Sequence, residues 1–129
     1  MEQTTKRFKK RDAILECVRQ TKVHPSADWV YARLKPDISD LSLGTVYRNL
    51  ALFKEQGLIT SLGTVKGVER FDGNINPHVH FVCESCGDVV DLMEIQLPPE
   101  LTTAASQMCG GTIQTSQLIF TGKCRNCQE

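Results

Sequence analysis

The sequence predicts an α+β fold in two parts, a helical N-terminal part that ends in a β-hairpin and a smaller, mixed C-terminal part. Three observations support this class. Apolar residues recur at helical spacing in three segments of the first half, glycine-bounded strand patterns follow, and two Cys-x2-Cys pairs stand at 83–86 and 124–127. A turn-rich stretch, Gly-Asn-Ile-Asn-Pro, separates the parts. We therefore expect domains over residues 1–72 and 78–129, joined by a hinge at 73–77.

Three helices are expected in the N-terminal part. The first covers about 9–20, where apolar residues fall at helical spacing, and the basic residues before it form a polar tail or a frayed first turn. The second follows Ser26 and covers about 27–35, and the third follows Ser42 and covers about 43–56. Serine is a preferred N-cap residue, because its hydroxyl accepts a hydrogen bond from a backbone N–H of the first turn.

Two strands, at 58–60 and 68–71, are expected after the third helix, around a glycine-containing loop at 63–67. Three helices followed by a hairpin make a winged helix, a variant of the helix-turn-helix. In that arrangement the third helix enters the major groove of DNA and the hairpin touches the backbone.

DNA contacts are expected from the third helix and from the basic N-terminal arm. An arginine on such a helix can bind guanine with two hydrogen bonds, and lysines and arginines of an arm contact phosphates. A plain helical subdomain with a solvated polar face, and a solvated tail, are the alternatives that the residues leave open. The candidate DNA-contacting residues are Thr45, Tyr47, Arg48, Lys9, Lys10 and Arg11.

The C-terminal part is expected to hold three strands and a helix. Strands at 79–82 and 89–92 flank the first cysteine pair, and a helix over 98–108 ends at two glycines. A third strand of weaker alternation is expected over 112–120, before the second cysteine pair. The second part is therefore expected to be a small α/β domain.

The charge distribution differs between the two parts, although the net charge is zero. Residues 1–72 carry 13 Lys+Arg against 9 Asp+Glu, and residues 73–129 carry 2 against 6. A basic first part suggests a polyanionic partner. The sequence contains no run of 18 apolar residues and no signal peptide, so we expect a cytoplasmic protein without a membrane span.

The six cysteines are better explained as metal ligands and free thiols than as disulfides in that compartment. Two Cys-x2-Cys pairs supply four thiolates, which suit a closed, tetrahedral, structural zinc site. A thioredoxin-like redox pair is the alternative for either pair alone. Cys17 and Cys109 are expected to be buried, inert thiols. The expected zinc ligands are Cys83, Cys86, Cys124 and Cys127.

A second group of potential ligands contains histidines and aspartates. His78 and His80 are two residues apart, so both rings point to the same face of an extended strand. His24, Asp72 and Asp91 have ordinary explanations when taken singly, as turn or solvated residues. Together, imidazole and carboxylate groups would make a mixed nitrogen and oxygen site that suits Fe(II), Mn(II) or Zn(II).

The sequence resembles the ferric uptake regulator family along nearly its whole length. The resemblance is carried by His-Pro-Ser-Ala-Asp at 24–28, Gly-Thr-Val-Tyr-Arg-Asn-Leu at 44–50, Arg-Phe-Asp at 70–72, His-Val-His-Phe-Val-Cys-Glu-Ser-Cys-Gly at 78–87 and the final cysteine pair. It implies a homodimeric, metal-dependent transcription factor with an N-terminal winged helix and a C-terminal dimerisation domain. It also implies binding to an inverted-repeat operator in double-stranded DNA.

Within the family the chain is most similar to repressors that sense hydrogen peroxide, because His24, Asp72, His78, His80 and Asp91 match their five regulatory ligands one for one. The resemblance implies Fe(II) or Mn(II) at this site, and oxidation of the residues that match His24 and His78 when iron meets peroxide. Iron-uptake regulators usually have glutamates at the two aspartate positions. The N-terminal extension is shorter than is usual in the family, and the first helix of that extension is expected to be absent.

Four other functions remain possible from the sequence. An iron- or manganese-responsive uptake regulator would use the same ligands without sensing peroxide. A zinc-uptake regulator is less consistent with the sequence, since no cysteine belongs to the regulatory group. A zinc-ribbon interaction module would not explain the basic first part, and an enzyme would need a general base beside a substrate pocket, which the sequence does not indicate.

Overall fold

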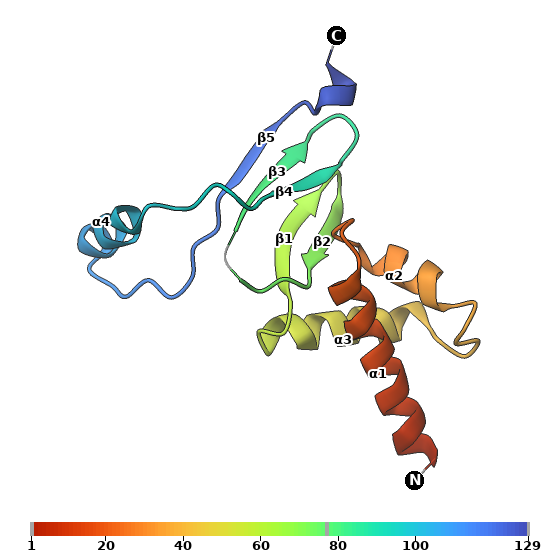
Figure 1. Cartoon of the computed structure of the whole chain (residues 1–129). Coiled ribbons are helices and arrows are strands. Elements are labelled where there is room, and N and C mark those ends of the chain that lie inside the picture. The colour runs from red at the N-terminus through yellow and green to blue at the C-terminus, as the bar shows by residue number, and fades with distance from the viewer. Residues whose placement is uncertain (1, 77, 129) are drawn as a thin grey trace. The chain divides into compact units, whose positions relative to one another are not determined.

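The computed structural model describes residues 2–76 and 78–128, with side chains from residue 9 onward, and divides into two compact units (Figure 1). Unit 1 extends to Ile75 and unit 2 begins at Asn76, so the boundary lies within the predicted 73–77 segment. That this segment acts as a hinge stays a prediction. No helix in the described ranges is long and apolar enough to cross a membrane.

The helices of unit 1 are α1 (Glu2–Gln20), α2 (Ala27–Leu34) and α3 (Leu43–Glu55). Both predicted N-caps are present: the Ser26 hydroxyl accepts the N–H of Trp29, and the Ser42 hydroxyl accepts the N–H of Thr45. The prediction of a tail before residue 9 was wrong, because α1 already begins at Glu2. Its first turns are rich in unbranched Glu, Gln, Lys and Arg residues, which lose little side-chain freedom in a helix.

The hairpin of unit 1 consists of β1 (Thr60–Val65) and β2 (Val68–Asp72), paired antiparallel. The predicted loop at 63–67 was too long, because β1 continues through Gly63 with a register irregularity there. The turn itself is Lys66-Gly67, and both residues have positive φ, 52° and 82°. Positive φ at both central positions is the geometry of a type I′ turn, which matches the twist of two-residue hairpins.

Unit 1 has its own hydrophobic core, where α1, α2, α3 and β2 meet. Phe53 of α3 is fully buried and Phe71 of β2 is nearly so. The core consists of Ile14, Val18, Ala27, Val30, Leu41, Val46, Leu50, Phe53, Ile59 and Phe71. This core contains residues from each of the three helices of unit 1, so each of them buries apolar side chains within the unit.

Glu69 of β2 connects the hairpin to α3. Its Oε2 accepts a hydrogen bond from the Ser61 hydroxyl at 2.6 Å and lies 3.1 Å from Lys54 Nζ. The Ser61 hydrogen bond, with a smaller contribution from Lys54, holds the pKa of Glu69 below the ordinary value of 4.5. Because the folded pKa is lowered, the stability that this carboxylate adds is present above the ordinary value and is lost as the pH falls through the folded pKa.

We expect Glu69→Gln to lower the free energy of unfolding of unit 1 by about 0.5–1 kcal/mol at neutral pH, and by less at an acidic pH below the folded pKa of Glu69, where the wild-type carboxylate is protonated. The effect is small because the Glu69 side chain is 41% exposed. Urea unfolding at both pH values measures it, with Glu55→Gln at an exposed position of α3 as the control. An equal loss at both pH values would contradict the prediction.

Unit 2 is built on a three-stranded sheet of β3 (Val79–Cys83), β4 (Val89–Leu92) and β5 (Ile119–Gly122). The strand order is β4-β3-β5, with β3 antiparallel to β4 and parallel to β5. The crossover to β5 contains α4 (Pro99–Cys109), which ends at Gly110 with φ of 72°. A parallel pair requires such a long connection.

The predicted strand over 112–120 was wrong over most of its length, since only the last residues pair with β3. Residues 112–118 are largely Thr, Gln and Ser, and they offer no apolar face for a sheet to bury. In the observed register Cys83 is opposite Gly122. The end of β3 and the end of β5 therefore bring the two cysteine pairs together.

Candidate metal centres and DNA-binding face

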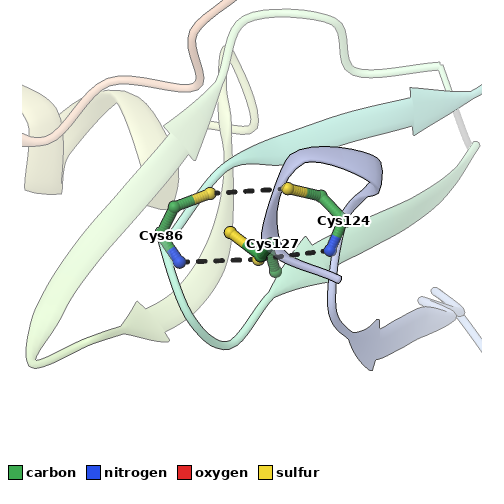
Figure 2. A group of neighbouring side chains, drawn as sticks. Cys86, Cys124 and Cys127 are labelled. Carbon is green, nitrogen blue, oxygen red and sulfur yellow. Dashed lines mark hydrogen bonds between the residues drawn. The ribbon is translucent and has the colours of Figure 1, made fainter. Parts of the chain in front are cut away.

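The four predicted zinc ligands of unit 2 form one cluster. Cys83 is the last residue of β3 and Cys86 lies in the tight turn that follows. Cys124 directly precedes a 3-10 turn after β5 (Arg125–Cys127, η1), and Cys127 is its last residue. All four sulfur atoms lie within 4.8 Å of one another. Figure 2 shows Cys86 and Cys124 on facing segments, with their sulfur atoms 3.8 Å apart.

Backbone N–H groups stabilise a thiolate at Cys83. The N–H of Cys86 and the N–H of Cys124 point to Cys83 Sγ at 3.4 and 3.3 Å, and they lower the pKa of this thiol to about 6. The pKa of Cys127 is raised to about 12, chiefly by its hydrogen bond to Cys124 and then by Cys83. Four sulfurs this close cannot all be thiolates unless a cation lies among them. A closed set of four sulfur ligands is the donor set of a structural zinc site, and the cluster fits that ion.

The remaining cysteines lie outside the cluster. Cys17 is half-buried in α1, and burial raises the pKa of its thiol. The prediction of a buried Cys109 was wrong, since it is exposed at the end of α4. Its sulfur lies 3.3 Å from the N–H of Gly111.

Unit 1 contributes one histidine and one carboxylate to the second predicted group. His24 and Asp72 are buried, and His24 Nε2 lies 3.4 Å from Asp72 Oδ2. The other carboxylate oxygen, Oδ1, accepts the N–H of Asn74 at 2.8 Å. The side chain of Asp72 is therefore oriented by the turn that follows β2, with one oxygen directed at the imidazole.

Unit 2 contributes two histidines and one carboxylate. His80 and Asp91 are paired across β3 and β4, and His78 precedes β3. The Nε2 atoms of His78 and His80 lie 3.0 and 3.2 Å from the same atom, Asp91 Oδ1. The two ring centroids are 4.2 Å apart. Both rings lie on the same side of this segment, as expected from the spacing of two residues, and both face one carboxylate oxygen.

A backbone carbonyl selects the tautomer of His78. Its Nδ1 lies 2.7 Å from the carbonyl oxygen of Asn76, which can only accept, so Nδ1 carries the proton. In a neutral imidazole with that tautomer, the lone pair of Nε2 faces Asp91 Oδ1. Both atoms are acceptors, so a cation or a second proton must lie between them. This donor set of imidazole nitrogen and carboxylate oxygen fits Fe(II), Mn(II) or Zn(II).

The candidate DNA-binding residues of α3 lie on its exposed side. Tyr47 and Arg48 are exposed, and Thr45 is half-buried. Arg48 Nη2 donates to the Thr45 hydroxyl at 3.2 Å, which in turn lies 2.8 Å from the Ser42 hydroxyl. Base or phosphate contacts by these side chains stay predictions.

The candidate residues of the arm have partners within unit 1. Lys10 Nζ lies 3.1 Å from Asp40 Oδ2, and the Arg11 guanidinium lies 5.6 Å from the centre of the Phe53 ring. Lys9 is exposed. Phosphate contacts by Lys10 and Arg11 would have to compete with these interactions, and contacts by all three stay predictions.

Three residues near the histidine and aspartate groups had no role in the sequence prediction. Arg70 donates hydrogen bonds to the carbonyls of His24 and Val23, Gly73 packs against α1, and Asn76 orients His78. Arg70 belongs to the Arg-Phe-Asp stretch that carries part of the family resemblance. Its two hydrogen bonds to backbone carbonyls, however, could not be predicted from the sequence.

Sequence comparison matches nearly the whole chain to one protein family. The sequence model described as "Ferric uptake regulator family" matches residues 2–120. The chain is 35% identical over 119 residues to the peroxide-responsive repressor PerR of Staphylococcus aureus, a match that covers 92% of this chain and 80% of that one.

Solved structures agree with this result. The Campylobacter jejuni peroxide stress regulator superposes with a TM-score of 0.83 at 25% identity, covering 98% of this chain and 94% of that one. The Francisella tularensis ferric uptake regulator with iron gives 0.70 at 25% identity, covering 92% and 91%. Proteins of this family are dimeric, metal-responsive DNA-binding regulators of transcription. The chain belongs to the ferric uptake regulator family.

Proposed function

We propose that this chain is a cytoplasmic repressor that senses hydrogen peroxide through Fe(II) at a site formed by its histidines and aspartates. The observation that carries the proposal is the convergence of His78 and His80 on a single oxygen of Asp91. The relatives named for peroxide sensing, from Staphylococcus aureus and Campylobacter jejuni, support the choice of stimulus.

The proposed site combines the ligands of both units around one ion. His24 and Asp72 come from unit 1, and His78, His80 and Asp91 come from unit 2. Three nitrogen and two oxygen ligands suit Fe(II) and Mn(II) and leave a position for a small molecule.

Binding of one ion by both units would couple metal occupancy to DNA binding. An ion with ligands in both units favours the arrangement in which the two α3 helices of a dimer enter successive major grooves of an inverted repeat. Loss of a single ligand histidine weakens the preference of the ion for this DNA-binding arrangement, so DNA is released.

Fe(II), when bound, would supply the redox activation of hydrogen peroxide with no net change in its own oxidation state, and Mn(II) would supply it poorly. His24 or His78 then gains one oxygen atom on a ring carbon, and the other peroxide oxygen leaves as water. The imidazole is oxidised by two electrons and the peroxide is reduced by two. Asp72 and Asp91 hold these rings beside the ion and stay chemically unchanged.

The test is peptide mass spectrometry after anaerobic loading with Fe(II) and a small excess of hydrogen peroxide, with an Mn(II)-loaded sample as control. Trypsin places His24 alone in peptide 23–33, whereas His78 and His80 share peptide 71–123 and require fragmentation. We expect one added oxygen on His24 or His78 in the iron sample only, with a parallel loss of binding to an inverted-repeat duplex.

Other outcomes identify the alternatives. Unmodified histidines with DNA binding intact would contradict peroxide sensing and favour an iron- or manganese-responsive uptake regulator that uses the same ligands. Oxidation confined to Cys83, Cys86, Cys124 and Cys127 would indicate a thiol switch at the zinc.

A further inference from the structure

We infer that Arg70 is a positioning residue that aims the His24 imidazole at the regulatory metal by holding the backbone on which His24 stands. The inference rests on the proposed function, because it requires His24 to be a metal ligand. Arg70 itself is not a ligand, since a guanidinium is always charged and has no free lone pair for a cation.

Arg70 of β2 binds two successive carbonyls of the segment between α1 and α2. Its Nε donates to the carbonyl of His24, and its Nη2 donates to the carbonyl of Val23 at 2.6 Å. The next carbonyl, of Pro25, accepts the N–H of Phe71 at 2.9 Å. Three consecutive carbonyls are therefore attached to two consecutive residues of β2.

The backbone at His24 needs this support. His24 has φ of 55°, in the left-handed region that few residues other than glycine adopt. Pro25 follows it, and a residue before proline favours extended geometry. A conformation of this kind persists only where the surrounding structure holds it, and at functional sites such holding is part of how a side chain is aimed.

The same strand carries the carboxylate that faces His24. Arg70 and Asp72 are two residues apart on β2, so their side chains point to the same side of the strand. The end of β2 is close to α1, since a Cβ on Gly73 would lie 2.6 Å from the Cα of Arg19. Arg70 thus holds the histidine backbone on the strand that also holds Asp72, and this keeps His24 Nε2 and Asp72 Oδ2 at 3.4 Å.

Arginine is suited to this role and lysine is not. The guanidinium is planar and presents several N–H groups in fixed directions, so two of them reach two carbonyls at once. A lysine ammonium is a single charged point on a flexible chain and would hold one carbonyl. Arg70→Lys should therefore retain part of the effect, and Arg70→Gln should lose it.

The experiment is a titration of the zinc-loaded protein with Mn(II), in which the electron paramagnetic resonance signal of the free ion is measured. We expect Arg70→Gln to weaken Mn(II) binding about 10- to 100-fold, the range for residues that orient a metal ligand, and Arg70→Lys to fall between it and wild type. Without Mn(II), we expect the amide N–H signals of Val23 and His24 in two-dimensional NMR to shift between wild-type protein and Arg70→Gln.

Three controls separate positioning from other effects. Arg33→Gln removes a charge from α2 away from the 23–25 segment and should leave Mn(II) affinity unchanged. Val30→Ala removes core packing in the same unit, so it should lower the melting temperature without changing Mn(II) affinity. Asp72→Ala removes a proposed ligand and should bind Mn(II) weakly.

Each remaining outcome decides the question. If Arg70→Gln binds Mn(II) like wild type while Asp72→Ala does not, the positioning role is wrong and the proposed site stands. If Asp72→Ala also binds like wild type, the ligand assignment fails and the inference fails with it. A loss in Val30→Ala equal to that in Arg70→Gln would attribute the effect to stability and overturn the inference. Should Arg70→Gln not fold, weaker binding by Arg70→Lys supports the role and unchanged binding overturns it.

Discussion

Replacement of Cys83 by serine is expected to remove the zinc and to unfold the sheet of unit 2, while unit 1 keeps its fold. Cys83 is the last residue of β3, it pairs with Gly122 of β5, and its sulfur is the target of two backbone N–H groups. The loss of this ligand therefore removes a metal bond and the link between two strands.

The loss of structure in unit 2 is expected to be large because few other interactions stabilise this unit. Its buried apolar residues among those described are Val79, Val82, Cys83 and Val89. So small a core contributes little, whereas a structural zinc contributes about 10–16 kcal/mol at neutral pH. Unit 1, in contrast, has a ten-residue core of its own.

Zinc content by mass spectrometry and amide NMR spectra would measure the effect. We expect less than one zinc per two chains in Cys83→Ser, with loss of dispersed signals from 79–122 and retention of those from the three helices of unit 1. Cys109→Ser, at the exposed cysteine outside the cluster, is the matched control and should keep its zinc and its spectrum. Full zinc and an intact sheet in Cys83→Ser would refute the structural role.

The helices were predictable because their signals are local. Ser26 and Ser42 cap helices within three residues of their own position, and apolar spacing marks the buried side. The strand β5 was not predictable in the same way, because its start is decided by pairing with β3 and not by its own alternation. The hairpin loop was predicted too long because Gly63 looked like a loop residue, whereas it pairs with Arg70 next to a register irregularity of β1.

The proximity within each cysteine pair and within the His78 and His80 pair was predictable for a related reason. Two cysteines or two histidines at short spacing on a turn or strand must lie close together, whatever the rest of the chain does. The contact between Arg70 and His24 joins residues 46 positions apart and depends on a left-handed backbone before a proline. Neither condition can be read from the residue types alone, so the residue that holds a ligand is found only in the structure.

Replacement of Asp91 by asparagine is expected to weaken Mn(II) or Fe(II) binding at least about 100-fold, beyond the 10- to 100-fold typical of residues outside the ligand set. One oxygen of Asp91 lies 3.0 and 3.2 Å from two imidazole nitrogens, so it is central to the unit 2 ligands. A neutral amide of the same shape lacks the negative charge that favours the cation. The fold should survive, because the pairing of His80 with Asp91 in the sheet is made by backbone groups.

Titration with Mn(II), zinc analysis and DNA binding on the same samples would test this, with Glu94→Gln as a control that removes an exposed charge shortly after β4. Unchanged Mn(II) affinity in Asp91→Asn would exclude Asp91 from the site.

Cys83→Ser and Asp91→Asn should differ in their effects on the two metal sites. His80 and Cys83 lie on the same short strand, β3, so loss of the zinc also removes the support for His80. We expect Cys83→Ser to lose both zinc and Mn(II) binding, and Asp91→Asn to weaken Mn(II) binding while it keeps its zinc. This asymmetry makes the zinc a condition for the regulatory site, and the regulatory metal can then exchange or be lost without unfolding the sheet that holds its ligands.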